Sequence, residues 1–143
     1  MFTKIKKIFG MTSPEVNARN ASFRILVVDD NEVDRRVVKN ILEKQGYQIL
    51  TANDGKEAVR VAMQEKPDVI VMDCEMPELS GVKACQRLKE ENETEHIPVI
   101  FLTGSDTPTN IIECYDLEAE NYLTKPVNAK LLLKDIETIL KDK

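Results

Sequence analysis

The chain has 143 residues, a length typical of one domain that can bury a core of its own. Apolar residues make up 42% and charged residues 31%, which indicates a soluble globular protein, and no apolar run approaches the roughly 20 residues that cross a membrane. The net charge of −5 argues against a general nucleic-acid-binding surface. Because the chain has one histidine, His96, and no cysteine pair at ligand spacing, a structural zinc site and Ser–His or Cys–His catalysis are disfavoured.

The first 22 residues differ in charge from the rest of the chain. They hold four basic residues and one acidic residue, a net charge of +3, which leaves −8 on residues 23–143. Residues 10–22 mix Ser, Thr, Asn and Pro without periodicity and predict a polar linker. We therefore expect residues 1–22 to form a basic, polar and flexible tail, followed by one domain over residues 23–143. The alternative is a short basic amphipathic helix that contacts a membrane or a partner. Its apolar residues at helical spacing are Phe2, Ile5, Ile8 and Phe9.

Three cysteines, Cys74, Cys85 and Cys114, are widely spaced along the chain. The basic N-terminus is not followed by the apolar stretch of a secretory signal peptide. We therefore expect reduced, mostly buried thiols in a cytoplasmic protein.

Short apolar runs alternate with segments of helical periodicity along the rest of the chain. The first run is continuous and rich in β-branched residues, which favours a strand buried on both faces. In chain order, the sequence predicts a strand at 24–28, a helix through 33–42, a strand at 47–51, a helix around 58–62, a strand at 68–72, a helix through 82–88, a strand at 97–102, a helix near 108–117, a strand at 121–124 and a helix at 128–141. This alternation of five strands with five helices predicts an α/β fold, in which a parallel sheet is covered by helices on both faces.

Polar side chains stand where the predicted strands end. Asp29 and Asp30 follow the first strand, Asp73 follows the third, Thr103 follows the fourth and Lys125 follows the fifth. In open α/β sheets, ligands bind outside the carboxyl ends of the strands, so these side chains are expected to face one crevice. Each of them alone is also compatible with a helix cap, a turn or a solvated charge.

The three carboxylates would repel one another without a counter-charge, and a divalent cation removes that cost. Carboxylate and carbonyl oxygens are hard ligands suited to Mg²⁺ or Mn²⁺, and few protein ligands with room for water favour Mg²⁺ over Ca²⁺. A lysine beside the metal adds a second cation. The predicted site is therefore suited to holding a tetrahedral oxyanion next to a carboxylate, as phosphoryl transfer requires.

Four segments in this order make the chain resemble a receiver domain of the two-component response regulators, of the kind found in chemotaxis regulators. They are ILVVDDN at 25–31, DVIVMDCEMPELSG at 68–81, IPVIFLTG at 97–104 and NYLTKP at 121–126. The separations agree as well, with 43 residues from Asp30 to Asp73, 30 from Asp73 to Thr103 and 22 from Thr103 to Lys125. The resemblance covers about residues 23–143. It implies a flavodoxin-like doubly wound (βα)5 fold with strand order 2-1-3-4-5.

The resemblance also implies roles for individual residues. Asp73 matches the phosphorylated residue, Asp29 and Asp30 match the acidic pair that holds Mg²⁺, and the backbone carbonyl of Glu75 matches a third protein ligand beside Asp73. Thr103 matches the switch hydroxyl and Lys125 the phosphate-binding lysine.

Further positions follow from the same resemblance. Tyr122 matches the switch aromatic, although an ordinary aromatic residue at a strand end is the alternative. Pro126 matches a proline that usually follows a cis bond. Glu75 and Ser105 lie two residues after Asp73 and Thr103, at places that tune the lifetime of the phosphoryl group in this family. For the Glu75 side chain, a solvated loop acid is the alternative.

Two positions depart from the family pattern. Gly104 follows Thr103 where another small residue is usual, which keeps the pocket open. Glu118 stands where glycine often ends the fourth helix, and a left-handed backbone there costs about 1 kcal/mol for a residue with a side chain.

The implied function is that of a stand-alone receiver rather than an enzyme acting on a metabolite. Asp73 would take a phosphoryl group from a histidine kinase or histidine phosphotransfer protein, because His96 lies away from the predicted site. A downstream protein would bind the face made by the fourth helix, the fifth strand and the fifth helix. The alternatives are a Mg²⁺-dependent phosphohydrolase with an aspartyl-phosphate intermediate and an adaptor that is not phosphorylated. Glu75 resembles the second acid of haloacid-dehalogenase-like enzymes, but Pro77 stands where those enzymes carry a threonine.

Overall fold

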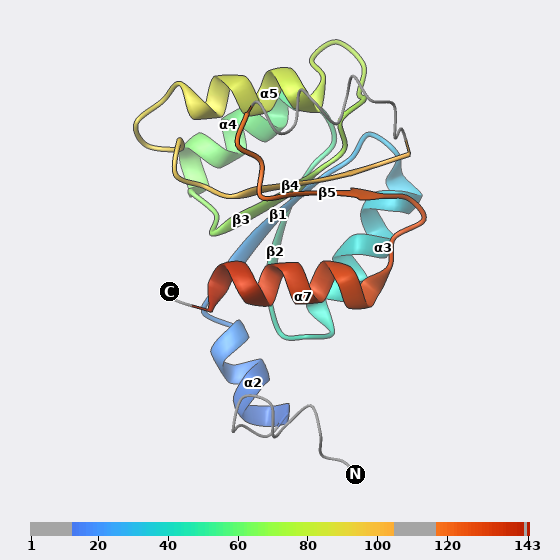
Figure 1. The fold of residues 1–143 in the computed structure, drawn as a ribbon, viewed down its shortest axis with the longest axis vertical. Helices are drawn as coiled ribbons and strands as arrows, with labels where there is room; N and C mark the ends of the chain where they lie inside the picture. The colour runs from blue at the N-terminus through green and yellow to red at the C-terminus, as the bar shows by residue number, and fades with distance from the viewer. Residues whose placement is uncertain (1–12, 105–116, 142) are drawn as a thin grey trace.

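A computed structural model describes residues 13–104, 117–141 and 143. Its elements in chain order are α2 (Ser13–Asn20), β1 (Arg24–Val28), α3 (Glu32–Glu43), β2 (Gln48–Ala52), α4 (Gly55–Glu65), β3 (Val69–Met72), α5 (Gly81–Lys89), β4 (Val99–Thr103), β5 (Asn121–Thr124) and α7 (Ala129–Leu140). The five strands form one parallel sheet in the order β2-β1-β3-β4-β5 (Figure 1). The α/β class and the 2-1-3-4-5 strand order predicted from the sequence are confirmed.

Helices cover both faces of this sheet. Helices α4 and α5 lie on one face, and α3 and α7 lie on the other (Figure 1). Each face buries its own apolar cluster: Ala58, Val82 and Leu88 belong to the first, and Leu42 and Ile136 belong to the second. The three central strands β1, β3 and β4 are buried on both sides, and for this reason they are nearly continuous apolar runs.

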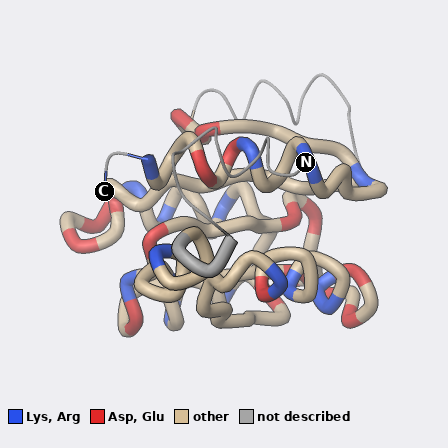
Figure 2. Tube along the Cα trace, turned by 90° about the horizontal axis from the view of Figure 1, so that it is seen from below, with Lys and Arg blue, Asp and Glu red and all other residues tan. Residues whose placement is uncertain are grey.

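Polar side chains start the helices that follow the strands. Asn31, Asp54, Ser80 and Asn128 each take the N-cap position, and their side-chain oxygens accept hydrogen bonds from backbone N–H groups in the first turn. These caps fix where the chain turns from the sheet into a helix, so they also fix the loops at the carboxyl edge of the sheet. Acidic and basic residues are interspersed along the described parts of the chain (Figure 2).

The structure differs from the expected elements mainly at the N-terminal side. Residues 13–20 form helix α2, where a linker without regular structure was expected. The expectation was wrong because α2 shows little amphipathic periodicity and is held instead by contacts with the folded domain. The division of the chain at residue 22 stays a prediction.

The remaining differences are small. Strand bounds shift by one or two residues, and the helix expected near 108–117 lies almost wholly outside the described residues. Glu118 has a φ of 57°, the left-handed conformation whose cost was considered for this position. Within the described part of the chain, no helix has the length and apolar character that crossing a membrane requires.

Candidate functional site

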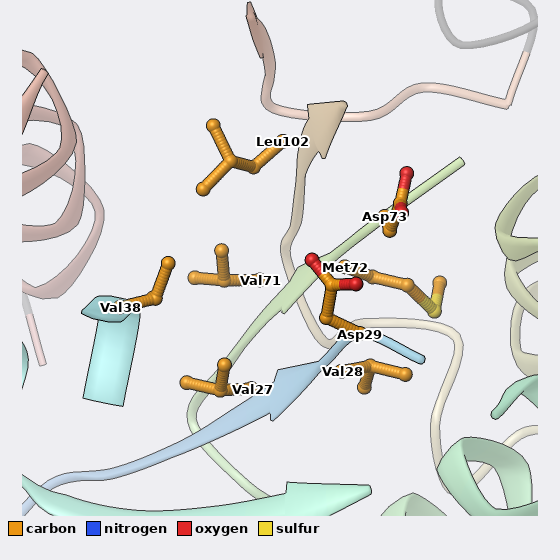
Figure 3. A pocket seen from close by; sticks show the side chains of 8 residues that line it. All are labelled: Val27, Val28, Asp29, Val38, Val71, Met72, Asp73 and Leu102. Carbon is orange, nitrogen blue, oxygen red and sulfur yellow. The ribbon is translucent and has the colours of Figure 1, made fainter. Parts of the chain in front are cut away.

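The predicted acidic residues meet at the carboxyl edge of the sheet. Asp29 and Asp73 continue β1 and β3 directly, and the N–H of Asp73 still donates to Val28 O at 3.0 Å, as a ladder residue does. Figure 3 shows their side chains beyond the ends of these two strands. Asp30 is exposed while the other two are buried, and one carboxylate oxygen from each of the three lies within 4.8 Å of the others. The strand-end argument therefore placed these three residues correctly.

Lys125 is the cation of this cluster. Its backbone N–H donates to Thr103 O at 2.8 Å, which holds the residue next to the end of β4. Its Nζ lies 2.8 Å from Asp29 Oδ2, 2.9 Å from Asp34 Oδ2 and 3.4 Å from Asp73 Oδ2. Burial opposes the charge on this ammonium, but hydrogen bonds to Asp29 and Asp34 and the charge of Asp73 outweigh it and raise the pKa of Lys125.

Asp34 is a member of the cluster that the sequence analysis did not identify. It lies in the first turn of α3, and Asn31 Oδ1 accepts its backbone N–H at 2.9 Å. An acidic residue in a first helical turn is explained by the helix dipole alone, so its type and position gave no separate signal. Three carboxylates, those of Asp29, Asp34 and Asp73, thus contact one lysine, and a fourth, that of Asp30, lies beside Asp29 and Asp73.

Asp73 sits in a mixed environment of burial and donors. Burial is the largest influence and raises its pKa, because a carboxylate loses hydration there. Three interactions lower the pKa: the backbone N–H of Glu75, which donates to Asp73 Oδ1 at 3.2 Å, the ammonium of Lys125, and a side-chain hydrogen bond with Thr103. The negative charge of Asp29 raises it further. Thr103 is buried, and its hydrogen bond with Asp73 connects the end of β4 to the end of β3.

The floor beneath Asp29 and Asp73 is apolar. A cavity of about 10 Å³, the space of roughly one water, lies there. It is lined by the two aspartates and by Val27, Val28, Val38, Val71, Met72 and Leu102 (Figure 3). These apolar neighbours leave little room for water at the inner side of both buried carboxylates, in agreement with the burial that raises the pKa of Asp73.

Contacts from α3 and from the start of α5 set the loops around the site. The N–H of Asn31 donates to Asp29 Oδ1 at 2.9 Å, and the Arg35 guanidinium donates to Asp29 O at 2.8 Å, so α3 fixes Asp29 from its first turn. At the start of α5, Gly81 passes so close to the strand end that a Cβ there would lie 2.0 Å from Asp73 O. Only glycine fits that approach, so the chain after Asp73 returns tightly over it.

Other sequence-predicted residues lie around the cluster. The Lys125–Pro126 bond is cis, as expected. Tyr122 is half-buried and packs against the apolar cluster under α4 and α5, and the Glu75 side chain is exposed. Gly104 has open space where a Cβ would be, and His96 is exposed. Cys74 and Cys85 are buried. Ser105 and Cys114 lie outside the described residues.

The donor set fits a small hard cation. Asp29, Asp30 and Asp73 offer three carboxylate oxygens close together. Of these three residues, Asp30 is exposed to solvent. Within the cluster, Lys125 offsets one of four negative charges. Carboxylates in such a number, with an open side for water, suit Mg²⁺ or Mn²⁺.

Comparisons with known proteins agree with this geometry. Residues 25–137 match the family model of the response regulator receiver domain. Protein PilH of Pseudomonas aeruginosa is 44% identical over 117 residues, which are 82% of this chain and 97% of PilH. The chemotaxis protein CheY4 of Vibrio cholerae has a solved structure with a TM-score of 0.77 and 31% identity, covering 82% of this chain and 98% of that chain.

A third similar protein has a metal at its site. The receiver domain of the sensor histidine kinase PA1611 of Pseudomonas aeruginosa PAO1 has a TM-score of 0.77 and 29% identity, covering 83% of this chain and 98% of that chain. In that structure a magnesium ion is coordinated in the active-site cleft. The family match, the sheet order and the coverage of these relatives lead to one conclusion: the chain belongs to the response regulator receiver domain family of two-component signalling.

Proposed function

We propose that this chain takes a phosphoryl group onto Asp73 from a phosphohistidine of a histidine kinase or histidine phosphotransfer protein. The observation that carries the proposal is the placement of Asp73, buried at the end of β3, 3.4 Å from Lys125 Nζ and next to two more carboxylates. In the reaction, an oxygen of Asp73 attacks phosphorus, the N–P bond of the donor breaks, and the donor imidazole leaves with the electron pair of that bond.

The residues around Asp73 have separate tasks in this proposal. Lys125 neutralises charge on the transferred group, and the hydroxyl of Thr103 donates a hydrogen bond to a phosphoryl oxygen. Asp29, Asp30, Asp73 and the backbone carbonyl of Glu75 would hold Mg²⁺ or Mn²⁺. A bound divalent cation supplies charge neutralisation for the carboxylates and the phosphoryl oxygens. The chain acts as a signalling protein, because the acyl phosphate stays on Asp73 as the signal.

The response to phosphorylation would pass through β5. When Thr103 turns toward the phosphoryl group, it vacates space that the Tyr122 ring could fill, and the surface of β5 and α7 changes with it. We propose this surface, together with the region expected to hold the fourth helix, as the contact for a downstream protein. Similarity to PilH over 97% of that protein supports a receiver whose output is a protein contact or a phosphorelay step.

Exposed apolar residues beside the site support docking of the donor protein. Val33 and Val37 lie one turn apart on α3, and Leu131 lies in the first turn of α7, all of them exposed. Val33 is next to Asp34, which contacts Lys125. Exposed apolar side chains on the helix that carries Asp34 favour contact with a protein surface that brings the phosphohistidine to Asp73.

Labelling with a small phosphodonor tests the proposal. Incubation with Mg²⁺ and acetyl phosphate is expected to give an acid-stable, base-labile phosphate on the wild type and none on Asp73→Asn. Asp54→Asn, which keeps an N-cap oxygen on α4 away from the site, is the matched control and is expected to label normally. Labelling of Asp73→Asn at the wild-type rate overturns the proposal. Catalytic turnover of p-nitrophenyl phosphate would indicate a phosphohydrolase, and no labelling at all would indicate an adaptor.

A further inference from the structure

A second concave site lies away from the phosphoryl-acceptor residues. It is a groove of about 540 Å³ between α2, the connection from α3 to β2, and α7. Val16, Tyr47 and Leu133 give it apolar walls. Its volume falls within the range of specific binding pockets, which are concave and mostly apolar with a few polar groups.

Helix α2 is fixed in place as one wall of this groove. The buried amide of Asn20 donates through Nδ2 to Gln45 O at 2.6 Å, and Arg19 Nη2 donates to Leu140 O at 3.2 Å. Gly46, with a φ of 96°, lies so close to α2 that a Cβ would be 2.7 Å from Asn17 O. These contacts tie α2 to the end of α3 and to the end of α7. Residues 13–20 precede the part of the chain that matches the family model, so one wall of the groove is an addition to the receiver fold.

The opposite wall is one continuous face of α7. Residues at positions 130, 133, 134, 137, 138 and 141 follow a spacing of three and four, so they lie in one row along the helix. Three of them are exposed lysines, Lys130, Lys134 and Lys141, and one is the acid Glu137. From Lys130 to Lys141 the row spans about 16 Å of helix. Positive charge therefore occurs at both ends and in the middle of the groove.

This charge distribution selects among occupants. A ligand with one anionic head needs cations at one end, whereas this groove has them along its length. A second copy of the chain that docked groove to groove would place lysines opposite lysines. Residues 1–12 do not complement the groove either, because they carry three lysines and no acidic residue. An amphipathic segment with an apolar face and acidic flanks satisfies both the apolar walls and the row of lysines.

We propose that the α2–α7 groove binds an acidic amphipathic helix of a partner protein. Its apolar residues would pack between Val16 and Leu133, and its acidic residues would pair with Lys130, Lys134 and Lys141. This interaction is separate from phosphoryl acceptance, because none of the described residues that line the groove belongs to the cluster around Asp73.

A titration of the full-length protein with two synthetic peptides tests the proposal. The first is a fluorescein-labelled helical peptide of about 15 residues with leucines on one face and glutamates beside them, and the second has lysines in place of the glutamates. Anisotropy is expected to show saturable binding of the acidic peptide and at least about tenfold weaker binding of the basic one. Amide NMR shifts are expected in α2, around Tyr47 and in α7. Absence of saturable binding of the acidic peptide up to about 1 mM overturns the proposal.

Charge-reversal variants locate the site. The double variant Lys134→Glu with Lys141→Glu is expected to weaken acidic-peptide binding by about tenfold, while Lys83→Glu, an exposed lysine on α5, leaves it unchanged. Equal loss in both variants indicates a general charge effect and overturns the proposal. Self-association that buries the groove also overturns the proposal. Binding to anionic phospholipid vesicles overturns it as well, if the double variant weakens vesicle binding as much as it weakens peptide binding. Asp73→Asn is expected to bind the peptide as the wild type does.

Discussion

Asp34 shares the lysine that the transferred phosphoryl group needs. Lys125 Nζ lies 2.9 Å from Asp34 Oδ2 and 3.4 Å from Asp73 Oδ2, so the ammonium rests nearer to Asp34 than to the proposed acceptor. The Asp34 side chain is 42% exposed, so solvent screens the pair and its net contribution is about 0.5–1 kcal/mol. Asp34→Asn removes this attraction while keeping the size of the side chain.

The size of the effect on phosphorylation follows from that pair. If Lys125 leaves Asp34 to meet the phosphoryl group in the transition state, the ion pair stabilises the ground state alone. Its removal then lowers the barrier by at most the same 0.5–1 kcal/mol, which is about a two- to fivefold faster reaction. Asp34→Asn is therefore expected to label about two to five times faster than the wild type with acetyl phosphate and Mg²⁺.

The matched control is Glu32→Gln. Glu32 lies in the same first turn of α3 and pairs with Arg36, so its variant removes one negative charge without touching Lys125. Initial labelling rates are measured for the three proteins at one concentration of donor and metal. A rate for Asp34→Asn at or below that of the wild type refutes the reasoning, because Asp34 would then orient Lys125 for the reaction. Equal acceleration in both variants also refutes it, because net charge alone would explain the change.

Three other outcomes are expected from the geometry. Gly81→Ala places a Cβ 2.0 Å from Asp73 O and should lower the free energy of unfolding, measured in urea, by about 1–3 kcal/mol. Gly104→Ala is the control, because a Cβ there meets open space, and it should change this free energy by less than about 0.5 kcal/mol. Equal effects of the two substitutions would contradict the close approach of Gly81 to Asp73. Burial raises the pKa of Asp73 above 3.8, so the folded state loses stability as pH rises through that raised pKa. Metal-free Asp73→Asn should therefore melt higher than the wild type at pH 7 and equal to it near about pH 3, and a lower melting temperature at pH 7 would count against this. Mg²⁺ should raise the melting temperature of the wild type more than that of Asp30→Asn, and equal shifts would place the metal elsewhere.

The strand-end rule explains why so much of the site was predictable. In a parallel sheet, residues that directly follow buried strands meet at one edge, so Asp29, Asp30, Asp73 and Lys125 could be brought together without knowledge of the loops. The left-handed backbone at Glu118 was one of two helix endings that the sequence left open, because such a conformation is common at a helix end.

Asp34 and α2 were not predictable for different reasons. The distance from Asp34 to Lys125 depends on how the first turn of α3 leans over the sheet, which no local pattern encodes. Helix α2 has eight residues, too few to be stable alone, and depends on long-range contacts such as Arg19 with Leu140 and Asn20 with Gln45.

The position of Lys125 has a mechanical consequence for the sheet. Strand β5 lies at the edge and pairs with β4 alone, so one ladder holds it. Lys125 directly continues this strand, and its ammonium reaches past β4 to Asp73 after β3 and Asp29 after β1. One side chain thus links an edge strand to the centre of the sheet. A change of charge at the centre changes the force on this side chain, and β5, which one ladder holds, can shift in response.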